Sequence, residues 1–283
     1  MRKLTVTTLT ALLSISLLPS LKAQDTTYGW RHALVASVNL AQVSFSHWAP
    51  GGTDAFSYVA MLNGKSEKNE PMTNWATSYK LAFGQTKLNG QEIRKGDDEI
   101  NLESMLTYKI GVHINPYAAV SLRTQFATGY EYPDSGGRIA VSGLFDPAYV
   151  MQSAGMGWKP SAIFQTRLGV ALREIFTNHY PQYAAEPLEP GSSHASRVQG
   201  GAESVSELAL PVDDNVLFRA KLDLFSPFKT MDRMVMHGET SLIAKVSKVF
   251  SAELAAVFVN DPDLSPFTQI KQGLSIGISY AIL

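Results

Sequence analysis

The chain has 283 residues, no cysteine and a formal net charge of −1. The lack of cysteine excludes disulfides, thiolate metal sites and a cysteine nucleophile, and the charge lacks the strongly basic footprint of a nucleic-acid-binding protein. Hydrophobic residues make up 45% of the chain, yet after the N-terminal segment no apolar run approaches the roughly 18 residues of a membrane-spanning helix.

The N-terminal segment has the pattern of a secretory signal peptide. Two basic residues precede the apolar segment Leu4–Leu21, and Ala23 then provides a small residue before a cut. We expect cleavage after Ala23, so that residues 1–23 are the signal peptide and residues 24–283 form one mature domain. An uncleaved membrane anchor is the alternative interpretation.

Twelve segments of the mature domain alternate large apolar residues with small or polar ones. Side chains on a β-strand point alternately to its two faces, so each segment is predicted to be a strand with one apolar face and one polar face. In the fourth segment, Ile100 and Leu102 alternate with Asn101 and Glu103. In chain order the segments are 30–44, 55–62, 75–84, 99–111, 117–130, 148–158, 162–173, 202–210, 215–225, 234–246, 250–259 and 274–283.

The connections between these segments alternate in length. Those after even-numbered segments are mostly short, as at 113–116 and 159–161, with 64–72 as a longer exception. Those after odd-numbered segments are longer: 85–98, 131–147, 174–200 and 260–269. Outer-membrane barrels are built with short periplasmic turns and long outer loops, so this alternation indicates a barrel with both ends of the chain on the short-turn side.

These patterns predict an all-β protein: a 12-stranded antiparallel transmembrane β-barrel, with 10 or 14 strands as alternatives. A soluble β-sandwich is the competing interpretation, because alternation alone fits both folds. A sandwich core would have to bury the charged faces, whereas strands of nine or more residues suit a tilted membrane crossing. Aromatic residues near strand ends also suit interfacial girdles: Tyr28, Trp30, Trp75, Tyr108, Tyr117, Tyr130, Trp158 and Tyr280.

The last segment carries a further resemblance. Gly277 is preceded by a polar residue and followed by the bulky residues Tyr280 and Ile282, an order similar to the C-terminal insertion signal of outer-membrane barrels. Leu283 departs from that signal, since many barrels finish on an aromatic residue. We expect this segment to close the wall by pairing with segment 30–44, because a membrane barrel cannot leave an open edge.

A second resemblance lies in the connection after the first segment. Trp48-Ala-Pro-Gly51-Gly52 forms a Trp-x-x-Gly-Gly motif, and this stretch and segment 117–130 are similar to an uncharacterised family of Gram-negative outer-membrane proteins. His47 stands where that pattern has Asn. The resemblance implies a barrel in the outer membrane of a Gram-negative bacterium and implies no activity. The motif is either a tight glycine loop anchored by Trp48 or a surface binding site.

The polar faces of the predicted strands carry both signs of charge in near balance. Buried charges must pair or stay hydrated, so this balance favours a lumen crossed by ion pairs, with a narrow wet path or none. The candidate lumen-lining residues are Glu99, Glu103, Lys109, Arg123, Gln125, Arg167, Arg219, Lys221, His237 and Glu239. The same faces carry Lys80, Glu203, Glu207 and Asp223.

Three functions remain open on this basis. The first is a small passive channel or uptake barrel with a charged lumen, and the second is a closed structural, adhesive or assembly barrel acting through its outer loops. The third, a lipid-modifying enzyme around His237, is disfavoured because Ser241 lies four residues away, about 13 Å along a strand. Acidic segments 96–99 and 260–263 lack the spacing of a calcium loop and are predicted to be solvated turns. We expect no cofactor and no nucleic-acid partner, and expect contacts with outer-membrane lipid, periplasmic chaperones and the barrel-assembly machinery.

Overall fold

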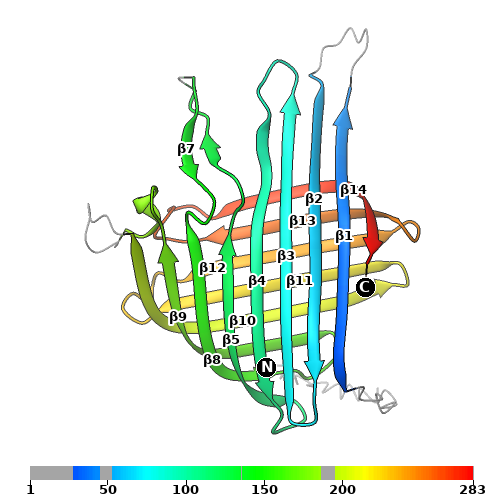
Figure 1. The fold of residues 1–283 in the computed structure, drawn as a ribbon, viewed down its shortest axis with the longest axis vertical. Coiled ribbons are helices and arrows are strands. Elements are labelled where there is room, and N and C mark those ends of the chain that lie inside the picture. The colour runs from blue at the N-terminus through cyan, green and yellow to red at the C-terminus, as the bar shows by residue number, and fades with distance from the viewer. Residues whose placement is uncertain (1–27, 45–52, 135, 186–194, 283) are drawn as a thin grey trace, which may run out of the picture.

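The computed structural model describes residues 28–44, 53–134, 136–185 and 195–282, and within them twelve strands close into one antiparallel barrel (Figure 1). The barrel strands are β1 (Gly29–Val43), β2 (Ala55–Asn69), β3 (Thr73–Leu88), β4 (Arg94–Tyr108), β5 (Ile114–Thr124), β8 (Ala148–Trp158), β9 (Phe164–Phe176), β10 (Ser196–Asp213), β11 (Val216–Pro227), β12 (Val235–Lys245), β13 (Phe250–Asn260) and β14 (Gln269–Ala281). Two more strands, β6 (Gly129–Glu131) and β7 (Ile139–Ser142), form a hairpin, and η1 (Pro181–Tyr183) is a short 3-10 turn. No helix in the described ranges is long and apolar enough to span a membrane.

The structure confirms the predicted twelve-stranded barrel and corrects two of the predicted loops. Strand β2 continues to Asn69, so connection 64–72 shrinks to the turn 70–72 and is no longer an exception to the short-turn rule. Connection 85–98 is also mostly strand, because β3 and β4 keep pairing well beyond the apolar part of each segment. These extensions are polar, so a search for apolar alternation misses them. In one of them, the side chain of Gln85 accepts a hydrogen bond from the Tyr58 hydroxyl at 3.0 Å.

The fifth predicted strand, 117–130, is wrong in its second half. Strand β5 ends at Thr124, and the next side chain, Gln125, donates hydrogen bonds to the carbonyl oxygens of Gly143 and Asp146 at 2.9 and 2.8 Å. Strand β6 pairs with β7 and not with the barrel. The resulting hairpin stands out from the barrel wall on the long-loop side (Figure 1).

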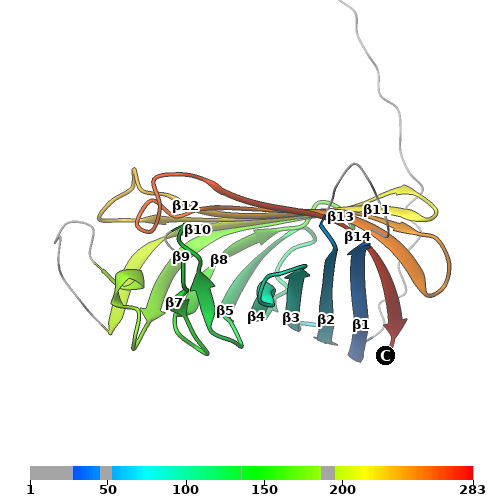
Figure 2. The ribbon, with the colours of Figure 1, turned by 90° about the horizontal axis from the view of Figure 1, so that it is seen from above.

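The barrel is flattened. In Figure 2 strands β10–β14 form a nearly flat wall, and strands β1–β5, β8 and β9 form a curved wall opposite it. Strands of the two walls cross steeply in Figure 1, as the tilt of strands in a closed barrel requires. Flattening brings side chains of the two walls within reach of each other.

The distribution of side chains is the reverse of that in a water-soluble protein. Apolar side chains point outward and are exposed, as Leu168 (65%) and Val170 (61%) are on β9. The charged Arg167 and Arg173 alternate with them on the same strand, point inward and are buried. A continuous exposed apolar belt around a polar interior is the arrangement of a transmembrane barrel.

Aromatic residues gather at the short-turn end of this outer face. Four of them are about half exposed there: Trp30, Trp75, Tyr108 and Trp158. The rings of Trp30 and Trp75 lie 6.1 Å apart. Tyr117 was predicted to belong to the girdle, and that prediction is wrong: its ring is buried in the lumen because its hydroxyl donates to Glu203 at 3.3 Å.

Strand β14 closes the barrel on β1, as predicted. Six residue pairs join the two strands, from Val35 with Ala281 to Leu40 with Ile276. A Cβ atom at Gly277 would overlap the side-chain amide of Asn39, so a larger residue there would require Asn39 to turn away. The side chains of Tyr280 and Ile282 face outward and are 68% and 48% exposed.

Candidate functional site: a lumen crossed by ion pairs

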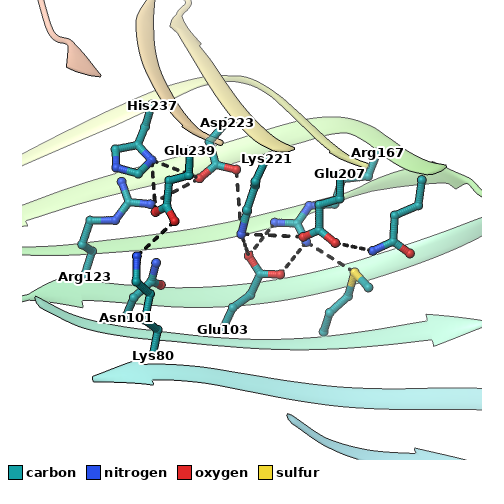
Figure 3. A network of polar contacts seen from close by, with 12 residues as sticks. Lys80, Asn101, Glu103, Arg123, Arg167, Glu207, Lys221, Asp223, His237 and Glu239 are labelled. Atoms are coloured by element: carbon teal, nitrogen blue, oxygen red, sulfur yellow. Dashed lines mark hydrogen bonds and ion pairs between the residues drawn. The ribbon is translucent and has the colours of Figure 1, made fainter. Parts of the chain in front are cut away.

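A layer of charged residues crosses the lumen between the two walls (Figure 3). We call it the central network, and its members are Lys80, Glu99, Glu103, Arg123, Arg167, Glu203, Glu207, Lys221, Asp223, His237 and Glu239. They come from seven strands, β3, β4, β5, β9, β10, β11 and β12. Strict alternation along each strand brings them to the inner face.

Arg167 and Glu103 form the most tightly held pair of the network. The guanidinium donates two parallel hydrogen bonds to the carboxylate at 2.9 and 3.0 Å and a third to Glu203 at 3.3 Å. This two-point geometry is the strongest that an arginine makes with a carboxylate. The side chains of Arg167 and Glu103 are only 9% and 15% exposed, so water competes little for the pair.

Other members connect opposite walls. Lys80 on β3 lies 2.8 Å from Glu99 on the neighbouring strand β4 and 3.0 Å from Glu239 on β12. Arg123 on β5 lies 3.2 Å from Asp223 on β11. Neither β3 and β12 nor β5 and β11 are neighbours in the barrel, so both contacts pass through the lumen.

Lys221 fills the space between these contacts. Its ammonium group lies 3.7 Å from both Glu103 and Glu207 and 3.9 Å from Asp223. One cation therefore shares three carboxylates from strands β4, β10 and β11. The network is continuous from Lys80 at one side of the lumen to Arg167 at the other (Figure 3).

His237 belongs to this network. Its Nδ1 atom lies 3.8 Å from Glu239 and 3.9 Å from Asp223. Ser241 is on the same face of β12, one lumen step beyond Glu239, and pairs in register with Arg219. The geometry thus places His237 among carboxylates, and the in-register partner of Ser241 is Arg219 and not His237.

A second charged cluster lies at the long-loop end of the lumen. In this loop-end cluster the guanidinium of Arg173 lies 2.7 Å from the carboxylate of Asp261. The carboxylate of Asp263 forms ion pairs with Arg197 at 2.7 Å and with Arg233 at 2.8 Å. The prediction that segment 260–263 is a solvated turn is therefore wrong. Both aspartates fold inward because inward-facing arginines of β9 and β10 need partners, and unpaired burial of those charges would be costly.

Asp146 anchors two long loops to each other. It accepts hydrogen bonds from the Thr177 hydroxyl at 2.5 Å and from the backbone amides of Asn178 and His179 at 3.1 and 2.8 Å. Burial alone would raise the pKa of the Asp146 carboxyl, but these hydrogen bonds outweigh it and lower the pKa below its ordinary value. The carboxylate is therefore ionised at neutral pH and holds the β9–β10 loop against the β5–β8 loop.

Seven of the ten candidate lumen residues meet in the central network, and three do not. Lys109 lies past the end of β4 and binds the side chain of Asn69 and the carbonyl of Glu70, so it fastens a short turn. Gln125 fastens the β5–β8 loop. Arg219 faces the lumen on the short-turn side of Lys221 and is exposed. Alternation places Arg219 correctly on the lumen face, but it does not tell how far along the barrel axis the side chain lies.

The motif residues Trp48, Gly51 and Gly52 lie outside the described residues, so their role stays a prediction. Sequence reasoning missed Asp146 and assigned Asp261 and Asp263 to a solvated turn, because loop residues follow no periodic pattern. The described residues contain no group of three or more His, Asp or Glu side chains placed to hold a metal ion.

Comparisons with known proteins agree with the predicted resemblance to an uncharacterised family. Residues 40–130 match the sequence profile of a family described as "Protein of unknown function (DUF3078)". This match includes both segments on which the resemblance was based. No curated protein matches the chain.

Several solved structures are distantly similar to the whole chain. The translocator domain of the autotransporter NalP from Neisseria meningitidis is 11% identical, with 90% of this chain and 89% of that one covered and a TM-score of 0.40. An outer membrane channel from Pseudomonas putida F1 is 12% identical, with 93% and 98% covered and a TM-score of 0.42. The NanC porin is 10% identical, with 88% and 98% covered and a TM-score of 0.38. Similarity at this level bears on neither substrate nor activity.

Proposed function

We propose that this protein is a β-barrel of the outer membrane of a Gram-negative bacterium whose lumen is closed by the central network, and that it acts through its long-loop end. Membrane insertion is supported by the exposed apolar belt, with Leu168 and Val170 in the middle of β9, and by the half-exposed aromatic residues at the short-turn end. Outer-membrane lipid, periplasmic chaperones and the barrel-assembly machinery are the partners that such a barrel needs.

The observation that carries the closed state is the set of ion pairs between opposite walls. Passage through the lumen would require Lys80 to leave Glu239 and Arg123 to leave Asp223. The four side chains are only 24–34% exposed, and several such pairs would have to separate at once for the lumen to open. This favours a closed structural, adhesive or assembly barrel over a passive channel, and the geometry around His237 favours no enzymatic role.

Single-channel recording in planar lipid bilayers tests the proposal. The folded wild-type protein is expected to produce no conductance steps. A variant that neutralises the strongest pair, Glu103→Gln with Arg167→Gln, is expected to produce steps, because the remaining charges of the network lose their arrangement. The matched control neutralises the exposed pair of Glu92 and Arg138, which are 3.5 Å apart, and is expected to stay silent.

Regular conductance steps from the wild-type protein would overturn the closed barrel and favour the passive channel. Silence of the Glu103/Arg167 variant would mean that a different layer, such as the loop-end cluster, also blocks the lumen. Neutralising Asp261 and Asp263 in addition would then be expected to open it.

A further inference from the structure

His237 lies between two carboxylates that hold the opposite walls of the barrel together (Figure 3). Its Nδ1 atom is 3.9 Å from Oδ2 of Asp223 and 3.8 Å from Oε1 of Glu239. The same Oδ2 atom of Asp223 accepts a hydrogen bond from Arg123 across the lumen at 3.2 Å. The other carboxylate oxygen of Glu239 binds Lys80, also across the lumen, at 3.0 Å. A change of charge on His237 therefore acts on both contacts at once.

His237 and the two carboxylates belong to the same wall. Glu239 is two residues from His237 on β12, and Asp223 pairs in register with His237 from β11, so all three lie on the flat wall (Figure 2). The two cations, Arg123 on β5 and Lys80 on β3, come from the curved wall. A positive charge on His237 would offer both carboxylates a partner that does not cross the lumen. The His237 side chain is only 14% exposed, so water screens such a charge weakly.

The surroundings of His237 contain charged groups from five strands. They are Lys80 on β3, Glu99 on β4, Arg123 on β5, Lys221 and Asp223 on β11, and Glu239 on β12 itself, the strand of His237. On β13 the residue in register with His237 is the apolar Val259. On β14 the charged residue is Lys271, which is paired with Asp97 of β4 at 2.8 Å.

The two walls carry opposite excess charge within the central network. On the flat wall four carboxylates accompany one cation: Glu203, Glu207, Asp223 and Glu239 with Lys221. On the curved wall three cations accompany two carboxylates: Lys80, Arg123 and Arg167 with Glu99 and Glu103. With His237 neutral, an excess of three negative charges faces an excess of one positive charge, and their attraction favours the closed lumen. A proton on His237 reduces the negative excess to two.

The cations of the curved wall also have carboxylates on their own wall. Lys80 already lies 2.8 Å from Glu99. Arg123 pairs in register with Asn101, so Glu99 and Glu103 are its diagonal neighbours on β4. Diagonal neighbours in an antiparallel sheet are within reach of a long side chain. The curved wall can therefore satisfy both cations without reaching across the lumen.

We propose that His237 is a proton-dependent gate of the lumen. When His237 is neutral, Asp223 and Glu239 hold the curved wall; when it is protonated, they turn to His237, the ion pairs re-form within each wall, and the lumen opens on this side. A histidine gains its proton at a pH at which most carboxylates are still ionised, so acid reaches the gate before it neutralises the network. This inference rests on the proposed closed lumen and adds the means by which it opens.

Single-channel recording in planar bilayers, over a pH series from 7.5 to 4 on both sides of the membrane, tests the gate. The wild-type protein is expected to be silent at pH 7.5, and the frequency of conductance steps is expected to rise at least about tenfold in acid. His237→Gln cannot gain a proton and is expected to stay silent where the wild type has opened. His237→Lys carries a permanent positive charge and is expected to produce steps already at pH 7.5.

The matched control is His113→Gln, which removes an exposed histidine from the turn between β4 and β5 and is expected to respond to acid like the wild type. Slow migration of the unheated protein in SDS gels shows that each variant is folded. Wild-type protein that stays silent down to pH 4, or that opens at the same pH as His237→Gln, would overturn the gate and leave the closed lumen standing. Steps from the wild type at pH 7.5 would contradict the closed lumen and the gate with it.

Discussion

Glu103 is the residue whose loss should weaken the barrel most clearly. Its carboxylate accepts two hydrogen bonds from Arg167, at 2.9 and 3.0 Å, and lies 3.7 Å from Lys221. Removing one partner of a buried ion pair costs about 3–5 kcal/mol. Glu203 still holds Arg167 at 3.3 Å after the change, so we expect Glu103→Gln to lower the free energy of unfolding by about 3 kcal/mol, the lower end of that range.

The assay is reversible urea unfolding of the protein folded in phospholipid vesicles, followed by tryptophan fluorescence. The control is Glu92→Gln, because the Glu92 side chain is 74% exposed and lies 3.5 Å from Arg138. Exposed pairs of this kind contribute about 0–1 kcal/mol. If Glu103→Gln and Glu92→Gln unfold at the same urea concentration, the central network does not stabilise the barrel and the reasoning is refuted.

Three further predictions concern the outer loops, the outer belt and assembly. Asp146→Asn should make the β9–β10 loop sensitive to limited proteolysis at pH 7. Because the pKa of Asp146 is lowered in the folded protein, its stabilisation is present at neutral pH and is lost as the pH falls through that lowered pKa, so the wild-type loop should become sensitive only in acid. A loop equally resistant to proteolysis in the variant and the wild type at pH 7 would contradict this anchor. Val170 faces outward in the middle of β9, so Val170→Arg should lower the free energy of unfolding by about 2–4 kcal/mol, whereas Val198→Arg near the end of β10 should lower it by about 0–1 kcal/mol. Equal losses in the two variants would argue against a membrane-buried belt. Tyr280→Asp with Ile282→Asp should block insertion, measured by heat-modifiable migration in SDS gels, while Phe267→Asp in an exposed loop should not; normal insertion of the double variant would contradict the role of the last strand.

Much of the fold could be predicted from alternation alone. Residues 148–158 are predicted and observed as a strand with the same bounds, although the alternation there is imperfect: Met151, opposite Arg173, faces the lumen, and Gln152, opposite Leu172, faces outward. Alternation fails where a strand is polar on both faces, as in the extensions of β2, β3 and β4. It also fails where a polar segment leaves the barrel to form its own hairpin, as β6 and β7 do.

The site was predicted in its composition and not in its pairing. Period-two spacing places Glu103 and Arg167 on inner faces, but their contact depends on how far the walls are flattened, which is a property of the whole barrel. The loop-end cluster shows the same limit, because Asp261 and Asp263 are found only after the loops fold over the arginines.

The measurement that tests the closed lumen most directly is the accessibility of single cysteines on either side of the central network. In vesicles that carry the protein with its long loops outside, a small charged maleimide is added outside only. Lys271→Cys, on the long-loop side, is expected to react quickly, and Arg219→Cys, on the short-turn side, is expected to react only after detergent is added. Equal labelling of both cysteines in intact vesicles would show a continuous path through the lumen and contradict the account.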